Sequence, residues 1–158
     1  MKRIDQKDHK IIAALYENGR ASIQELAEMT GIRRDTVVYR LKRLQLRGVI
    51  ERIQPIIQPR QLGYQAYVAT LIKVKPQSEK REIFEVGLLT LGNVTHCVRV
   101  LGKYDYLLMI AGQDVREIDR VFESIKAFSP GFIDDIESLS VVEELKVDNF
   151  AGLFSQAG

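Results

Sequence analysis

Positive charge is concentrated between residues 33 and 47 in a way that suits the binding of an anion. These fifteen residues hold six Lys and Arg side chains and one acid, Asp35. An ordinary exposed helix mixes charges of both signs. The helix dipole favours basic residues near the end of a helix, but Arg33 and Arg34 stand at the start, where their charge is unfavourable. An external anion explains these two better, and the phosphate of nucleic acid is the natural candidate.

The elements around this stretch predict a helix-turn-helix. Ser22 and Glu25 form a capping box that starts a short helix, and Gly31 permits a tight turn into the next one. That next helix, over residues 33–47, has a buried stripe at helical spacing made of Val37, Leu41 and Leu44. Another helix, over residues 4–19, precedes them, and Asp5 can cap its start. A helix-turn-helix of this kind binds double-stranded DNA.

Helix-turn-helix geometry divides the basic helix into two parts. Its N-terminal part enters the major groove, so we expect one set of side chains to reach base edges or nearby phosphates: Arg33, Arg34, Asp35, Thr36, Tyr39 and Arg40. Arginine pairs with guanine, Asp35 can accept from cytosine and the Thr36 methyl group can meet thymine. The later basic residues are expected to hold phosphates without reading sequence: Lys42, Arg43 and Arg47. Ser22, at the start of the segment, completes the predicted DNA-binding set.

The charge of the whole chain is divided unevenly. Residues 1–62 carry 13 basic and 7 acidic side chains, and the remaining residues carry 10 and 14. A basic nucleic-acid-binding half joined to a more acidic partner has this asymmetry. The single Cys97 cannot form a disulfide within the chain, and the sequence has no metal-ligand cluster, no signal segment and no membrane-length apolar run. We therefore expect a soluble cytoplasmic protein with no metal and no cofactor.

A linker is predicted after the basic helix. Residues 49–58 alternate in part between apolar and polar side chains, which predicts one or two short strands, or a wing, that Pro55 confines to a sheet edge. Pro59 and residues 61–64 predict a turn and hinge. The predicted domains are a DNA-binding domain at 1–50, a strand and hinge linker at 51–64, and a second domain at 65–158.

The second domain has the order strand, helix, strand, strand, helix, strand. The strands are predicted at 66–74, 94–101, 105–111 and 132–146. The predicted inner faces of the helices are Ile83, Phe84, Val86, Leu88 and Leu91 in one, and Val115, Ile118, Val121, Phe122 and Ile125 in the other. Asp114 and Glu117 form a second capping box. This order predicts a ferredoxin-like βαββαβ sandwich, so the fold class is α+β with an N-terminal winged helix-turn-helix.

Two helices on one face of a sheet leave the other face uncovered. Apolar residues within 68–72 and 107–111 would be exposed there in a monomer, so we predict that sheets pair between two subunits. A homodimer also suits a helix-turn-helix, because two recognition helices can reach the half-sites of a pseudo-palindrome about one helical turn apart.

Short motifs in both halves keep a characteristic order. They are Ile4-Asp5 with Asp8, Gly19 to Ser22, Glu25 to Ala27, Thr36 to Leu44, Gly48 to Ile50, Leu62 to Tyr64, Gly102 to Tyr106, and Pro130-Gly131 with Lys146. In these the sequence resembles the leucine-responsive regulator and AsnC family, also called feast/famine regulators, over essentially the whole chain. It departs from the family at Arg33, where Ser is common, and at Ser138, where Thr is usual. Losing Ser removes a helix cap worth ~1 kcal/mol, which makes Arg33 a candidate for target-specific binding.

The resemblance implies a transcription regulator that dimerises through its sheet, often with dimers assembling into tetramers or octamers. It also implies a small effector, typically an amino acid, bound between dimers near the hairpin loop. Carried over by position, the effector residues are Gly102, Lys103, Tyr104 and Asp105, with Asp114 and Ser138 as neighbours. The amides at Gly102 can bind a carboxylate and Asp105 or Asp114 can pair with an ammonium group. A plain hairpin turn at Gly102 and a plain helix cap at Asp114 are the alternatives.

Two other functions are open. The chain also resembles the siroheme decarboxylases, which share this two-domain fold, and residues 96–99 (HCVR) are similar to part of their sheet domain. Two observations argue against this function. The only other histidine in the sequence is His9, and such an enzyme would not need the basic helix. The second alternative is an effector sensor that does not bind DNA.

Overall fold

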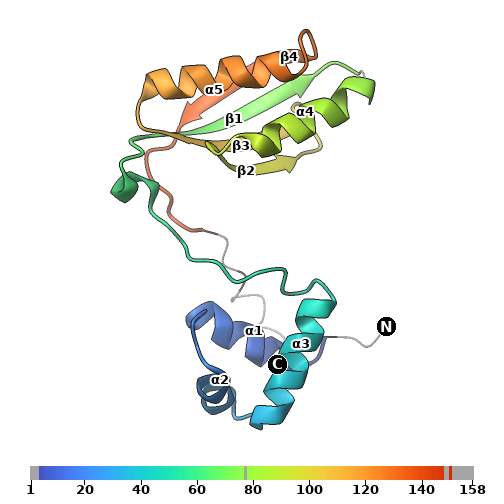
Figure 1. Cartoon of the computed structure of the whole chain (residues 1–158), viewed down its shortest axis with the longest axis vertical. Coiled ribbons are helices and arrows are strands. Elements are labelled where there is room, and N and C mark those ends of the chain that lie inside the picture. Colours follow the sequence, from blue (N-terminus) through green and yellow to red (C-terminus); the bar gives the residue numbers. More distant parts are fainter. Residues whose placement is uncertain (1–3, 77, 148–149, 151–158) are drawn as a thin grey trace. The chain divides into compact units, whose positions relative to one another are not determined.

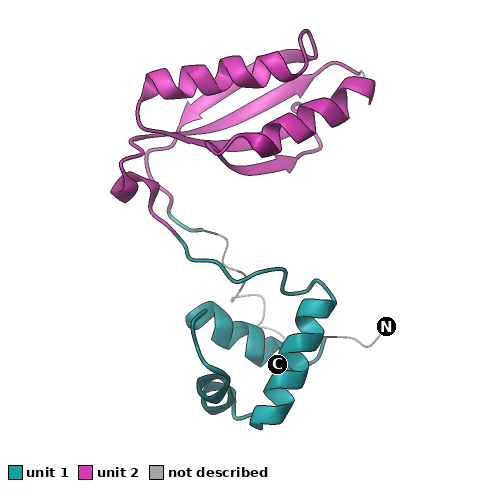
Figure 2. Cartoon of the chain, in the orientation of Figure 1, with its two compact units in different colours: residues 1–56, 145–158 teal, residues 57–144 magenta. Residues whose placement is uncertain are grey.

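The computed structural model describes residues 4–76, 78–147 and 150. The chain divides into two compact units, residues 1–56 with 145–158 and residues 57–144 (Figure 2). The predicted boundaries at 50 and 64 lie on either side of that division, and the predicted end of the second domain lies outside the described residues. No described helix is both long and apolar enough to cross a membrane.

The first unit contains the three predicted helices. They are α1 (Gln6–Glu17), α2 (Ile23–Thr30) and α3 (Arg34–Leu46). Ile11, Leu26, Val37 and Leu44 are buried together and form most of the core, with Ile32 added from the turn. The predicted stripe of the third helix is therefore confirmed, although Leu41 is only partly buried against this core.

The predicted wing is wrong. Residues 51–58 form no strand, and Pro59–Leu62 form the short 3-10 helix η1. Ile53, Ile56 and Ile57 are exposed. The alternating pattern has no partner strand among the described residues, and a single strand without a partner leaves its backbone groups to water.

The second unit is the predicted βαββαβ sandwich. Its elements are β1 (Ala66–Val74), α4 (Ser78–Thr90), β2 (Val94–Arg99), β3 (Tyr106–Gly112), α5 (Val115–Phe128) and β4 (Ile133–Ser140). The strands form one antiparallel sheet in the order β2-β3-β1-β4. β1 has its predicted bounds, whereas β4 ends six residues earlier than predicted and β2 two residues earlier.

Both helices cover one face of this sheet, as Figure 1 shows. Their buried residues share one core with alternate residues of the strands: Ile72, Val74, Phe84, Leu88, Tyr106, Leu108, Ile110, Ile118, Val121, Ile125 and Phe132. The predicted inner faces need correction at Ile83, Val86 and Val115, which are 61%, 58% and 70% exposed. Gly87 takes the inner position on α4, and a Cβ there would lie 2.3 Å from the Phe128 ring, so α4 and α5 approach closely at this point.

The opposite face of the sheet is covered by none of the described helices. The strand pairing aligns Leu71 with Leu107, Ala69 with Met109, and Val98 with Leu107, so these side chains share that face. Leu139 of β4 pairs with Ala69 and is 53% exposed. The predicted apolar face is therefore present in the fold.

Candidate nucleic-acid interface and effector site

The turn between α2 and α3 depends on one glycine and two buried side chains. Gly31 ends α2 in the left-handed region, at φ 67° and ψ 23°, which a residue with a Cβ rarely adopts. The Thr30 hydroxyl donates to the Leu26 carbonyl at 2.6 Å, and Ile32 enters the core. The turn is thereby fixed, and α3 begins in a defined direction.

The capping box at the start of α2 is confirmed. The Ser22 amide donates to Glu25 Oε2 at 2.7 Å, and the Glu25 amide donates to Ser22 Oγ at 3.2 Å. The hydrogen bond from the Ser22 amide lowers the pKa of the Glu25 carboxyl below its ordinary value. Ser22 therefore has a structural role that does not depend on DNA.

Most of the predicted contact residues lie on the exposed side of α3. Arg33, Arg34, Asp35, Tyr39 and Lys42 are exposed, and Thr36 is half-buried. The Arg33 side chain makes no cap hydrogen bond, as expected where arginine replaces a capping residue. These side chains are free to meet a ligand.

Three exposed residues of α3 were missed by the sequence reasoning. Val38 is 45% exposed, Leu46 is 79% exposed, and Gln45 is also exposed. The spacing of Arg34, Val38 and Lys42, four residues apart, was the available signal, because residues four apart lie on one helical face. Val38 therefore lies between two basic side chains on the outer surface.

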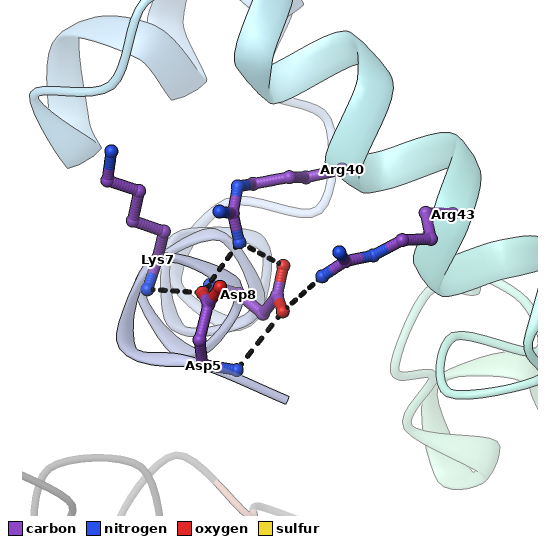
Figure 3. Close-up of polar contacts among 5 residues, drawn as sticks. All are labelled: Asp5, Lys7, Asp8, Arg40 and Arg43. Carbon is purple, nitrogen blue, oxygen red and sulfur yellow. Dashed lines mark hydrogen bonds and ion pairs between the residues drawn. The ribbon is translucent and has the colours of Figure 1, made fainter. Parts of the chain in front are cut away.

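Arg40 and Arg43 do not lie on the outward face, and their predicted placement there is wrong. Both side chains are only 15% exposed and turn toward the start of α1 (Figure 3). Arg40 Nη1 lies 2.6 Å from Asp5 Oδ1 and 2.9 Å from Asp8 Oδ1, and Arg43 Nη2 lies 2.5 Å from Asp8 Oδ2. We call these four side chains the α1–α3 ion cluster. The sequence reasoning assigned Asp5 as a cap and took Asp35 as the one acid near the basic helix.

Asp5 has two roles in this cluster. Its Oδ1 accepts from the amides of Lys7 and Asp8 at 3.0 and 3.1 Å, which caps α1 as predicted, and the same atom accepts from Arg40. The hydrogen bond from Arg40 is the main reason that the pKa of Asp5 falls from 3.8 to about 2. The same contact raises the pKa of the Arg40 guanidinium. The charged forms of both groups are thereby stabilised.

Arg47 ends α3 and is half-buried. Its Nη1 atom and the Nε atom of Arg43 are buried and have no hydrogen-bond partner among the described residues. Arg47 is therefore less accessible than the exposed Lys42, although both were predicted to hold phosphate.

The predicted effector loop, Gly102 to Asp105, joins β2 to β3 in the second unit. Asp105 Oδ2 accepts from the Val74 amide at 2.9 Å, so this carboxylate closes the end of β1. Lys103 Nζ lies 4.8 Å from the centre of the Tyr104 ring, and its backbone oxygen accepts from Lys73 Nζ at 3.1 Å. The Tyr104 hydroxyl donates to Glu137 Oε2 in a short hydrogen bond. The loop thus gathers both signs of charge.

Asp114 and Ser138 do not join that loop within one chain. Asp114 caps α5, accepting from the Glu117 amide at 2.8 Å, and it follows β3 whereas the loop precedes β3. Ser138 Oγ lies 3.1 Å from Thr70 Oγ1 in the middle of the sheet. Glu137, which does contact the loop, was not predicted because the sequence did not reveal which residues of the last strand lie beside the hairpin.

The two histidines and the segment 96–99, which suggested a decarboxylase, lie in different parts of the structure. His96 is exposed on β2, and His9 belongs to α1 in the other unit. Burial raises the pKa of the Cys97 thiol, and Arg99 Nε lies 3.6 Å from Glu85 Oε1. Within the described residues, no group of His, Cys, Asp and Glu side chains could hold a metal ion.

Comparison with known proteins gives consistent matches along the chain. An AsnC-type helix-turn-helix domain matches residues 4–45, and an Lrp/AsnC ligand binding domain matches residues 67–149. The leucine-responsive regulatory protein of Haemophilus influenzae is 30% identical over 94% of this chain and 90% of its own length. The proline dehydrogenase transcriptional activator of Rhizobium radiobacter is 32% identical over 75% of this chain and 76% of its own.

A solved structure agrees with these matches. The crystal structure of a transcriptional regulator from Neisseria meningitidis, in complex with L-Met, superposes with a TM-score of 0.81 at 25% identity. The superposition covers 92% of this chain and 94% of that one.

The variant Asp5→Asn tests the charge of the α1–α3 ion cluster. Asparagine also caps helices, so the cap is kept while the ion pair with Arg40 is lost. Because the folded-state pKa of Asp5 is lowered from 3.8 to about 2, its contribution to stability is complete above about pH 4 and is lost as the pH falls toward 2. We expect the variant to be less stable at neutral pH, with the difference shrinking over that window, as measured by urea unfolding at a series of pH values. A difference that stays constant down to about pH 2 would show that the charge contributes nothing.

Proposed function

The chain belongs to the Lrp/AsnC family of DNA-binding transcription regulators, and from that premise we propose which of its side chains contact DNA, a second subunit and an effector. The observation that carries the DNA proposal is the exposed face of α3, where Arg34, Val38 and Lys42 follow the fixed turn at Gly31. This face enters the major groove.

Each exposed side chain of α3 has a proposed role set by its position. Arg34 lies in the first turn and pairs with a guanine edge, while Asp35 and Tyr39 contact neighbouring bases or phosphates. The methyl groups of Val38 meet a thymine methyl group. Lys42, one turn further along, binds phosphate. Arg33, before the first turn, is a candidate for either role.

Substituting Arg34 and Lys42 with alanine separates base reading from phosphate binding. Arg34→Ala should weaken binding to a duplex selected from a random pool by roughly 5- to 150-fold, since a bidentate pair with guanine is worth about 1–3 kcal/mol, and should relax the preference at one base pair. Lys42→Ala should weaken all sequences alike and reduce the slope of log K against log salt by about 0.9. Fluorescence anisotropy at several salt concentrations measures both. Equal effects of the two variants on selected and random DNA would refute this division of roles.

The uncovered sheet face supports pairing of two subunits. Leu71, Leu107, Met109 and Val98 lie together on that face, and Leu139 extends it onto β4. A second copy of the sheet would bury these side chains symmetrically. The resulting dimer supplies the two copies of α3 that a pseudo-palindromic site requires.

A lysine on this face tests the dimer. Met109→Lys should convert the dimer into a monomer, because its ammonium group would be buried at the centre of the paired sheets. Val115→Lys makes the same change at an exposed position of α5, where the side chain is 70% exposed, and should leave the dimer intact. Light scattering after size-exclusion chromatography measures the mass. Equal masses for Met109→Lys and the wild type would place the dimer interface elsewhere.

The hairpin loop supports the effector proposal. Backbone amides at Gly102 and the ammonium group of Lys103 suit a carboxylate, while Asp105 Oδ1 and the Glu137 carboxylate suit an ammonium group. A ligand with both groups is an amino acid, and one relative of known structure is a complex with L-Met. We place Asp114 and Ser138 in the same site only if a second subunit brings them to the loop.

The effector proposal is tested by the change in melting temperature on adding an amino acid. L-Met, followed by a panel of the common amino acids, should raise the melting temperature of the wild type, because a ligand that binds only the folded state stabilises it. Glu137→Gln should abolish the rise, whereas Asp119→Asn, on exposed α5, should keep it. If no amino acid changes the melting temperature or the oligomer mass, the loop is not an amino-acid site.

A further inference from the structure

The α1–α3 ion cluster occupies two of the six basic residues that the sequence offers to DNA. We propose that Asp5 and Asp8 are specificity-determining positioning residues: they hold α3 through Arg40 and Arg43 and keep those two charges away from phosphate. The inference rests on the proposed DNA contacts of α3. It goes beyond them by assigning a role in recognition to two acids that do not face the DNA-binding surface.

Burial makes the cluster a permanent part of the fold. The Asp8 side chain is 0% exposed, and each of its carboxylate oxygens accepts from a different arginine, with the Asp5 amide as a third donor. A buried carboxylate without partners is very unfavourable, so both guanidinium groups are required where they are. If either arginine moved to bind a phosphate, the buried carboxylate of Asp8 would lose a partner, which is very unfavourable.

The two arginines also define how α3 is oriented. Val37 and Leu44 pack α3 against the core, but apolar contact alone tolerates sliding and rotation about the helix axis. Arg40 and Arg43 are three residues apart, which places their anchor points about 4.5 Å apart along that axis. The two directional contacts drawn in Figure 3 lie at different heights along the axis, so together they fix both the rotation and the position of the helix. The exposed Arg34 and Val38 are thereby aimed at the same bases in each binding event.

Sequestering the two charges lowers the affinity for DNA of any sequence. Affinity for random duplex comes almost entirely from the number of cations that neutralise phosphates, whereas a specific site adds contacts to base edges. A regulator with Arg40 and Arg43 free would bind all DNA more tightly without reading it better. Sequestering them lowers both affinities by a similar factor, whereas the orientation that the cluster gives to α3 favours the specific site alone and so increases the ratio of specific to random affinity.

The variant Asp8→Asn tests the proposal in the full-length chain. It keeps the shape of the side chain but frees the charge of Arg43 and part of that of Arg40. We expect the affinity for random duplex to rise and its salt slope to steepen by about 0.9 for each freed arginine. The ratio of affinities for a selected and a random duplex should fall by about fivefold or more, because a less firmly oriented α3 weakens the base contact of Arg34. An unchanged ratio or an unchanged slope would overturn the proposal.

A loss of folding would give a different result. If the acids only stabilise the unit, Asp8→Asn lowers both affinities together and does not steepen the slope. The milder Asp5→Asn keeps the cap of α1 and frees only the part of the Arg40 charge that Asp5 pairs, so it should steepen the slope by a smaller amount even if Asp8→Asn unfolds. The double variant Asp8→Asn with Arg43→Gln should return the slope most of the way to the wild-type value, because only the part of the Arg40 charge that Asp8 paired then remains free.

Two controls separate this proposal from the DNA contacts on which it rests. Glu17→Gln makes the same change in net charge at an exposed position of α1 and frees neither arginine of the cluster, so its salt slope should equal that of the wild type. Lys42→Ala should lose about 0.9 of the slope. The double variant Asp8→Asn with Arg43→Gln, which leaves no buried carboxylate unpaired, should not fall below the wild-type slope. If Lys42→Ala has no effect, the proposed DNA face is wrong. If Lys42→Ala behaves as expected but the double variant also has a flatter slope than the wild type, Arg43 binds phosphate and the inference fails.

Discussion

The burial of one carboxylate organises the DNA-binding unit. The Asp8 side chain is fully buried, so its charge must be balanced from within the protein, and the balance comes from two arginines on α3. The neighbouring Asp5 joins the same cluster while it caps α1. A capping interaction, a helix-to-helix contact and the distribution of charge on α3 thus depend on the same few atoms. Because these contacts are shared, a unit of only three short helices can present a surface of defined orientation.

The second unit depends on a different constraint, which is that two helices can cover only one face of a four-stranded sheet. The covered face holds the large aromatic side chains, with Phe84 packed edge-on against Tyr106 and Phe132. The Tyr106 hydroxyl donates to Glu85 at 2.7 Å, and burial raises the pKa of this tyrosine to about 12. The other face carries smaller apolar side chains at matching positions of neighbouring strands. The core of the unit is therefore covered by its own helices, whereas the opposite face of the sheet is not.

The sequence predicted elements better than it predicted side-chain environments. Periodicity located each described α-helix and β1, because spacing alone distinguishes helix from strand, whereas η1 was predicted only as a turn. It failed at the wing, where an alternating pattern lacks a partner strand. It also misplaced Arg40 and Arg43, because the residue type alone does not reveal whether an arginine side chain points at DNA or at a buried acid. The acid partner, Asp8, lies more than thirty positions earlier in the chain. The loop around Tyr104 was located by resemblance, but its contact with Glu137 needed the strand pairing.

The order of the strands has a consequence for self-association. β4 lies at one edge of the sheet, where unpaired backbone groups would otherwise invite another strand to add on. Its exposed residues include Asp134, Asp135 and Glu137, so two such edges meeting side by side would bring like charges together. Growth of the sheet into a continuous, fibre-like array is thereby opposed at this edge. On the uncovered face the apolar side chains of Leu71, Leu107 and Met109 lie on β1 and β3, away from this charged edge strand, so a second copy has an apolar surface to meet on the face of the sheet and a charged one at its edge.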